Sequence, residues 1–104
     1  MKTMDIEDVF SSRVRMKILK ALAQLGELNV SEIARRLGVN YETTAKHLEI
    51  LEAERIVQHK KFGRIRLYRL DENSPKARAV QTLLNAWKKQ SEPVKNGQFR
   101  SSSP

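Results

Sequence analysis

The sequence predicts an α+β fold, in which several helices surround a small core and one antiparallel β-hairpin projects from them. Two short helical patterns with a glycine between them lie within residues 30–51. Two β-rich runs then flank Gly63-Arg64. The length of 104 residues and the hydrophobic content of 39% fit a single domain of ordinary size.

Two helices are expected before the central pair. Ser12 can cap the longer of them, which runs to about Leu25 and stops at Gly26. Residues 28–30 can then supply a short strand that pairs with the hairpin. A shorter helix over residues 5–10 has an apolar side formed by Ile6, Val9 and Phe10. The expected inward residues of the longer helix are Val14, Ile18, Leu22 and Leu25, with Leu19 and Ala21 at the margins.

Residues 30–51 predict two helices joined by a tight turn. Ser31 can cap the first helix, Gly38 can end it with a positive φ, and Asn40 can cap the second. The pattern is typical of a helix-turn-helix, whose second helix enters the DNA major groove. The alternative is an αα-hairpin of the kind found in many helical domains. The residues expected to face inward from the second helix are Thr44, Leu48 and Leu51.

The hairpin expected over residues 56–70 is strongly basic. Gly63-Arg64 suits a two-residue turn of type II′, which takes glycine first. After a helix-turn-helix, a hairpin of this charge is expected to be a wing that contacts DNA. The alternative is a sheet edge protected by charge, which explains some of the lysines but not a run of six cations without an acid. These cations stand at positions 55, 60, 61, 64, 66 and 69.

A last helix is expected from Pro75, which fits a first helical turn, to about Lys89. Its apolar stripe can cover the domain's own core or meet a second copy of the chain. Residues 1–90 are expected to form the DNA-binding and dimerisation domain, and residues 91–104 a flexible C-terminal tail. The stripe has the spacing i, i+3, i+4 and i+7 and consists of Val80, Leu83, Leu84 and Trp87.

Composition favours a polyanionic partner and gives little support to catalysis. The chain has 20 Lys and Arg against 12 Asp and Glu, a net charge of +8. It contains no cysteine, which excludes disulfides and thiolate zinc sites. His47 and His59 are far apart in sequence and have no evident carboxylate or cysteine companions, so we expect no enzyme activity, no cofactor and no metal site. Residues 1–10 carry three acids and no apolar run, so no signal peptide is expected. No membrane partner is expected either, because no predicted helix is long and apolar enough to span a bilayer.

Over roughly residues 10–87, the chain resembles the small winged-helix repressors of the ArsR type. Arg55 departs from their pattern, which has a glycine there as a positive-φ helix stop. Metal-sensing members carry a cysteine cluster near the recognition helix, which this chain lacks. The matching segments are Val14 to Leu22, Ile33-Ala34-x3-Gly38, His47-Leu48-x2-Leu51, Ile56-Val57 and Gly63-Arg64-x3-Tyr68-x-Leu70-Asp71.

The resemblance implies a winged helix-turn-helix regulator that binds double-stranded DNA as a homodimer. It would be a repressor that occludes a promoter, associated with the nucleoid in a bacterial or archaeal cytoplasm. Two alternatives stay open: an architectural, chromatin-type DNA binder of low sequence specificity, and a winged-helix module that binds RNA or a protein complex. The dimer interface is expected at the two apolar clusters outside the helix-turn-helix and wing, which contain Ile6, Val9, Phe10, Val80, Leu83, Leu84 and Trp87.

The N-terminal half of the second helix of the motif is expected to read base edges. Asn40 and Thr43 can hydrogen-bond to bases or phosphates, and Lys46 can reach guanine O6 and N7. Tyr41 can place its hydroxyl on a phosphate or pack into the core. His47 is expected to be a neutral polar contact, rather than a pH switch or a metal ligand.

Contacts with the DNA backbone are expected from the start of the preceding helix and from the wing. Ser31 and the free N–H groups beside it can hold a phosphate. Lys60, Lys61 and Arg66 can lie along the phosphates. Arg64 at the hairpin tip is expected to enter the minor groove, where an arginine reads groove width.

Overall fold

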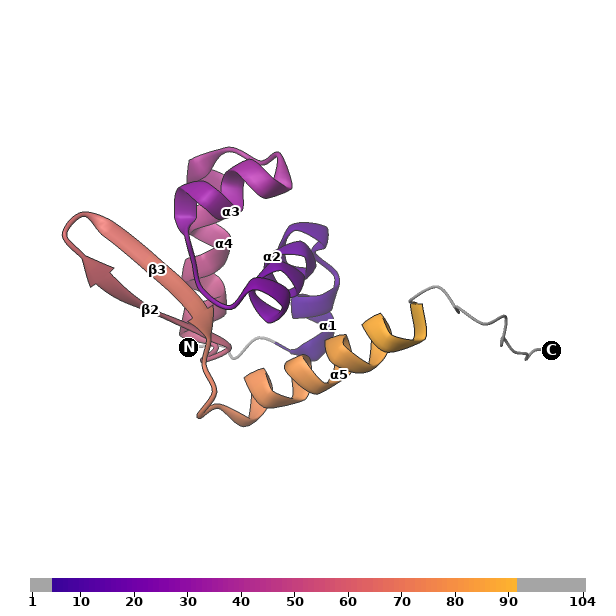
Figure 1. Cartoon of the computed structure of the whole chain (residues 1–104). Helices are drawn as coiled ribbons and strands as arrows, with labels where there is room; N and C mark the ends of the chain where they lie inside the picture. Colours follow the sequence, from indigo (N-terminus) through magenta and orange to yellow (C-terminus); the bar gives the residue numbers. More distant parts are fainter. Residues whose placement is uncertain (1–4, 92–104) are drawn as a thin grey trace.

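The computed structural model describes residues 5–91, and within them it contains five helices and one three-stranded sheet (Figure 1). The predicted fold class and chain order are confirmed. The tail predicted from residue 91 lies outside the described residues except for Ser91, which is the last residue of the final helix. The elements are α1 Ile6–Phe10, α2 Arg13–Leu25, β1 Leu28–Asn29, α3 Val30–Leu37, α4 Tyr41–Ala53, β2 Val57–Phe62, β3 Ile65–Leu70 and α5 Pro75–Ser91.

The start of α3 differs from the prediction. Asn29, not Ser31, is the N-cap, and its Oδ1 accepts a hydrogen bond of 2.7 Å from the backbone N–H of Glu32. Because Val30 is already helical, Ser31 lies within the first turn, where it is exposed and caps nothing. The predicted cap of α4 is confirmed, since Asn40 Oδ1 accepts from the N–H of Thr43 at 2.8 Å.

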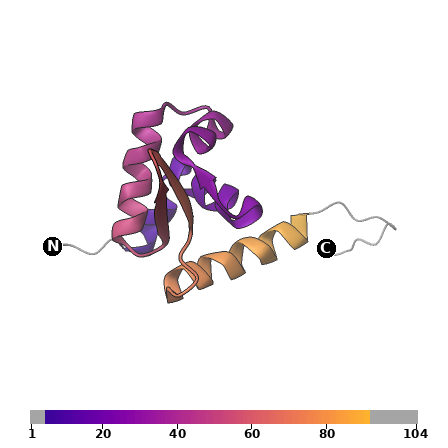
Figure 2. The ribbon, with the colours of Figure 1, turned by 60° about the vertical axis from the view of Figure 1, so that its left-hand side comes forward.

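The three strands are antiparallel, in the order β1-β3-β2, so the short strand predicted before α3 does pair with the hairpin. Phe62 pairs with Ile65, which leaves Gly63 and Arg64 as a two-residue turn. Gly63 has a φ of 61°, and Arg64 is not among the described residues with positive φ. That combination is typical of the predicted type II′ turn. In Figure 2 the hairpin stands beside α4.

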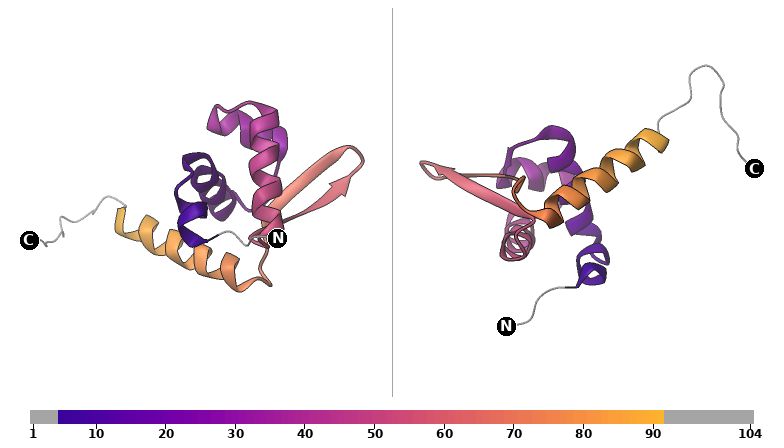
Figure 3. Two further views of the ribbon diagram at one scale, coloured as in Figure 1. Left: turned by 180° about the vertical axis from the view of Figure 1, so that it is seen from behind. Right: turned by 90° about the horizontal axis from the view of Figure 1, so that it is seen from below.

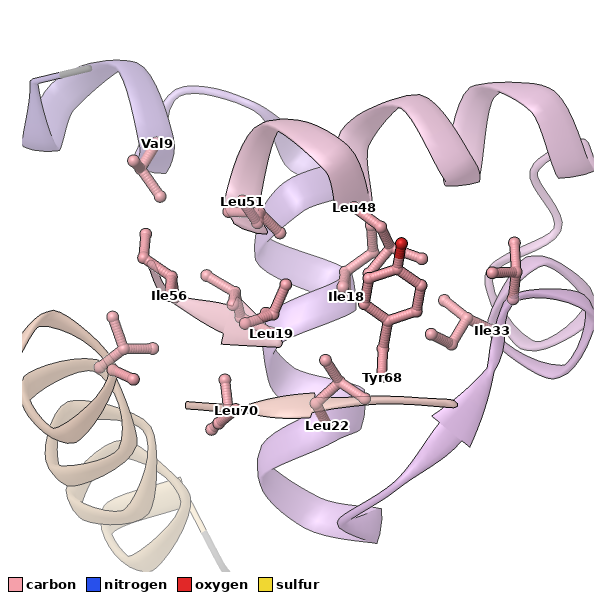
Figure 4. Packing of buried hydrophobic residues seen from close by; sticks show 14 of the residues in the cluster. Val9, Ile18, Leu19, Leu22, Ile33, Leu48, Leu51, Ile56, Tyr68 and Leu70 are labelled. Atoms are coloured by element: carbon pink, nitrogen blue, oxygen red, sulfur yellow. The ribbon is translucent and has the colours of Figure 1, made fainter. Parts of the chain in front are cut away.

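The core lies between α2, α4 and the sheet (Figure 4). The predicted inward set of α4 is confirmed, because Thr44, Leu48 and Leu51 have no exposed surface. For α2 the prediction was wrong at two positions. Leu19 is fully buried, whereas Leu25 is 48% exposed, because the elements that cover the middle of α2 do not extend over its last residue. The largest fully buried side chain is Tyr68 of β3.

The helix end at Arg55 keeps the geometry of a glycine stop without the glycine. The N–H of Arg55 bonds to the carbonyl of Glu52 at 2.9 Å, and the N–H of Ile56 bonds to that of Leu51 at 3.0 Å. This is the Schellman pattern, and it places Arg55 at a φ of 63°. Gly38 ends α3 with the same pair of bonds, from Gly38 to Arg35 and from Val39 to Ala34.

Arg55→Gly is therefore expected to stabilise the protein. A left-handed backbone costs a residue with a Cβ about 1–2 kcal/mol, and the extra freedom of glycine in the unfolded chain offsets part of that gain. We expect a rise in melting temperature of about 4–8 °C per kcal/mol gained, measured by circular dichroism. Lys17→Gly, at an exposed position inside α2, is the control. It should lower the melting temperature, because glycine destabilises a helix interior. A lower melting temperature for Arg55→Gly would show that contacts of the arginine side chain outweigh the backbone strain.

Candidate nucleic-acid interface

One side of α4 is held by the core and the other is open to solvent. Lys46 is exposed, Thr43 and His47 are half-buried, and Tyr41 at the start of the helix is 49% exposed. The alternative that Tyr41 is a core residue is therefore wrong. From behind, α4 lies at the front of the molecule with the hairpin beside it (Figure 3, left). The structure thus brings together the predicted base-reading residues at the N-terminal half of one open helix.

Asn40 has less freedom than the sequence suggests. Its Oδ1 accepts from the N–H of Thr43, which fixes the orientation of the amide and leaves one lone pair of Oδ1 and the NH2 group for DNA. Bidentate recognition of adenine requires one donor and one acceptor from the same amide. Asn40 can form that pair only in the orientation that the cap imposes, and its NH2 group can also donate to a base acceptor or to a phosphate.

His47 is joined to α2 and α1 through Arg15, a contact that nothing in the sequence pattern indicates. Arg15 Nη1 lies 3.1 Å from His47 Nδ1, and Arg15 Nη2 donates to the carbonyl of Asp8 at 2.8 Å. A guanidinium can only donate, so Nδ1 accepts and a neutral ring carries its proton on Nε2. Burial, and after it the charge of Arg15, lowers the pKa of His47 below its usual value. The imidazole is thus neutral at pH 7, with the Nε2–H group left as a possible DNA donor.

In the wing, Arg66 is directed at its own protein. Its Nη1 donates to the Tyr68 hydroxyl at 3.3 Å and lies 4.0 Å from a carboxylate oxygen of Glu49. A hydrogen bond with Tyr41, more than any other contact, raises the pKa of the Arg66 guanidinium. The prediction that Arg66 lies along the phosphates does not account for these contacts. Arg66 instead lies between Tyr68 of β3 and Glu49 of α4.

The other wing cations extend further from the body. Lys60 Nζ lies 3.7 Å from a carboxylate oxygen of Glu27, which is a weak ion pair at a half-exposed site. Lys61 and Arg64 are exposed, and neither forms an ion pair with an acid in the part of the chain that the structure describes. The hairpin tip is therefore the least neutralised cationic surface of the wing.

The sequence model described as "Bacterial regulatory protein, arsR family" matches residues 12–59, from the start of α2 into β2. HlyU from Vibrio cholerae is 27% identical over 79% of this chain and 86% of its own, with a TM-score of 0.68. The transcriptional repressor BigR from Xylella fastidiosa is 26% identical over 83% of each chain, with a TM-score of 0.69. The chain is similar to the ArsR-like winged helix-turn-helix regulators.

Mb0332 from Mycobacterium bovis is described as a homodimeric winged helix-turn-helix DNA-binding domain. It shares the fold of this chain, with a TM-score of 0.66 over 86% of this chain and 92% of its own, at 22% identity. In this ArsR-like chain α1 and α5 carry exposed apolar side chains, and both helices lie on the side away from the hairpin tip (Figure 1).

The predicted dimer residues of this ArsR-like chain divide into two groups. Val9 and Val80 are only 5% and 7% exposed, so they belong to the core of the protomer. Ile6, Leu83 and Trp87 are exposed, and Phe10 and Leu84 are half-buried against the core. Leu83 borders two hollows, one of about 420 Å³ between α2 and α5 and one of about 230 Å³ between α1 and α5. The open apolar surface is thus smaller than the predicted stripe, and it centres on Leu83 and Trp87.

Neither a metal-binding cluster nor a membrane-spanning helix is found among the described residues. Residues 5–91 contain no cluster of three or more His, Asp or Glu side chains that could hold a metal ion. Among the helices of the same residues, none is both long and apolar enough to cross a membrane. His59 forms a local pair instead, with its Nδ1 2.8 and 2.9 Å from the two carboxylate oxygens of Glu52.

Proposed function

We propose that the protein is a homodimeric repressor that binds a specific sequence in double-stranded DNA and occludes a promoter. The observation that carries the proposal is the open side of α4 next to a hairpin whose tip cations, Lys61 and Arg64, have no ion pair with the described acids. In a winged helix-turn-helix this arrangement places α4 in the major groove and the wing on the backbone or in the adjacent minor groove.

Base readout is assigned to Thr43 and Lys46, with a smaller part for His47. Thr43 can donate or accept through its hydroxyl and can contact a thymine methyl group, while Lys46 can donate to guanine. The Nε2–H of His47 can donate to a base acceptor, since Nδ1 is taken by Arg15. Asn40 and Tyr41, at the start of α4, support these contacts by hydrogen bonds to phosphates or neighbouring bases.

Backbone contacts are assigned to Ser31 and the outer wing. Ser31 is exposed in the first turn of α3, where backbone N–H groups favour an anion. Lys60, Lys61 and Arg64 supply charge from the hairpin. Arg66 is removed from this set, because its guanidinium is engaged by Tyr68 and Glu49 within the protein.

We infer that the protein works on DNA in the cytoplasm, associated with the nucleoid of a bacterial or archaeal cell. ArsR-family proteins are transcriptional regulators and not enzymes, so the proposed function involves neither catalysis nor a cofactor. The proposal needs no membrane and no metal.

Selection of duplexes from a random pool, followed by hydroxyl-radical footprinting, tests the proposal. A dimer should protect a palindrome whose half-sites lie about 34 Å apart, one helical turn of DNA. Continuous protection without a discrete site would identify an architectural binder. Tighter binding to structured RNA than to any selected duplex would overturn DNA regulation altogether.

Salt dependence tests the role of the wing. Lys61→Ala and Arg64→Ala are each expected to weaken binding to every duplex, and to reduce the slope of log affinity against log salt by about 1.8 per dimer. The value follows from about 0.9 per phosphate contact and two wings. Lys89→Ala, near the far end of α5 from the wing (Figure 1), is the control and should keep the wild-type slope. An unchanged slope in both wing variants would place the hairpin outside the interface.

A further inference from the structure

The tip of the β2–β3 hairpin carries two large apolar side chains that the rest of the chain leaves open. Phe62 and Ile65 lie directly opposite each other across the turn, so both side chains are on the same face of the hairpin. Their exposed fractions are 57% and 49%. Single exposed apolar residues are ordinary, but this pair is contiguous and sits at the end of an element that projects away from the helices (Figure 1).

The charge around the pair indicates what kind of surface it meets. Lys60 Nζ lies 5.7 Å from the centre of the Phe62 ring, Lys61 precedes the ring, and Arg64 lies in the turn. An apolar protein surface would desolvate these cations without supplying an opposite charge, which is unfavourable. The minor groove of a duplex offers both surfaces needed, because its walls are deoxyribose and its rims are phosphate.

We propose that Phe62 and Ile65 form an apolar wedge that enters the minor groove of duplex DNA beside the site read by α4 and opens a base step there. The inference rests on the proposed function and adds a second source of specificity. Wedging side chains partly unstack a step, and pyrimidine–purine steps such as TA are the easiest to open. The wing then selects deformable DNA at positions where it makes no hydrogen bond to a base.

Two duplexes with the same base pairs separate this effect from groove chemistry. An alternating AT duplex of about 30 base pairs and an A-tract duplex of that length expose the same minor-groove acceptors but differ in stiffness. We expect the wild-type protein to bind the alternating duplex about fivefold more tightly than the A-tract duplex, and Phe62→Ala to lose this preference. The adenine analogue 2-aminopurine, placed at a TA step, should fluoresce more when the wild type binds and should not respond to Phe62→Ala.

Three variants serve as controls. Phe62→Leu keeps an apolar wedge and should retain the preference. Lys61→Ala should weaken both duplexes and leave their ratio unchanged. Arg64→Ala should widen the ratio, since arginine favours the narrow minor groove of an A-tract. Phe62→Ala should also keep the wild-type salt slope, because the ring neutralises no phosphate.

The outcomes separate failure of the wedge from failure of the proposed function. Binding by Phe62→Ala with an unchanged duplex ratio, or a wild type that causes no fluorescence change, overturns the wedge and leaves DNA binding intact. Absence of binding to either duplex by the wild type overturns both. A change in sedimentation of Phe62→Ala without DNA would show that the pair contacts a second copy of the chain, and this also overturns the wedge.

Discussion

Leu83→Glu is expected to give a folded monomer that binds a palindromic duplex about a hundredfold more weakly than the wild type. The loss arises because two linked recognition helices bind with an avidity that each helix alone does not have. Leu83 is the best position for the charge, since it is 41% exposed and borders both hollows along α5. A glutamate there would be buried without a partner in the dimer, while in the monomer it would remain in water.

Leu84 is a poorer choice for this test, because it packs partly against the core and a charge there could unfold the domain. Thr82→Glu, at an exposed position on the same helix, is the matched control and should remain dimeric. Sedimentation reports the assembly, and circular dichroism reports the helical content. A wild type that is monomeric at micromolar concentration, or a Leu83→Glu variant that is still a dimer, would place the interface elsewhere.

Thr43→Ala combined with Lys46→Ala is expected to remove most of the difference in affinity between a selected site and a random duplex. One good base contact discriminates by about 1–3 kcal/mol, and a symmetric dimer makes each contact twice. The expected loss of discrimination is therefore about 4–12 kcal/mol if both residues read bases, an upper range that non-additivity reduces. Binding to random duplex should fall much less.

Competition titrations at one fixed salt concentration measure this ratio, because affinities at different salt are not comparable. Lys89→Ala, which removes a cation at the far end of the protein, is again the control. Its ratio of affinities for the selected and random duplexes should match that of the wild type. If the double variant loses affinity for both duplexes in proportion, Thr43 and Lys46 contact only the backbone. Residues other than Thr43 and Lys46 would then have to discriminate between DNA sequences.

The local features of the fold were predictable because short-range chemistry decides them. Asn40 caps α4 and Gly63-Arg64 turns the hairpin, and both follow from two to four neighbouring residues. Ser31 shows the limit of such reasoning. Asn29 and Ser31 are both good caps two positions apart, and pairing of Asn29 with Leu67 of β3 fixes where the strand ends and α3 begins.

The roles of long side chains could not be predicted, because their partners come from distant parts of the chain. Arg15 and His47 are 32 residues apart, and only the packing of α2 against α4 brings them within 3.1 Å. In the sequence Arg66 is one more wing cation, whereas in the structure Tyr41 and Tyr68 interact with its guanidinium. Charge composition therefore indicated the kind of partner correctly, while it overestimated how many cations are free to meet it.

The contacts of Arg66 also set a rule for how the binding site can change in evolution. Arg66 contacts Tyr68 of β3 and lies 4.0 Å from Glu49 of α4, and Tyr68 shares the core with Leu48 of α4, so the wing and the recognition helix keep a fixed spacing. Base substitutions can accumulate one at a time within the DNA that α4 and the wing contact, because they leave this spacing unchanged. One inserted base pair between the two contacted regions, however, would rotate the flank by about 34–36°, since a turn holds 10–10.5 base pairs. Operators of related proteins should therefore differ by base substitutions, while the distance between the bases contacted by α4 and those contacted by the wing stays constant.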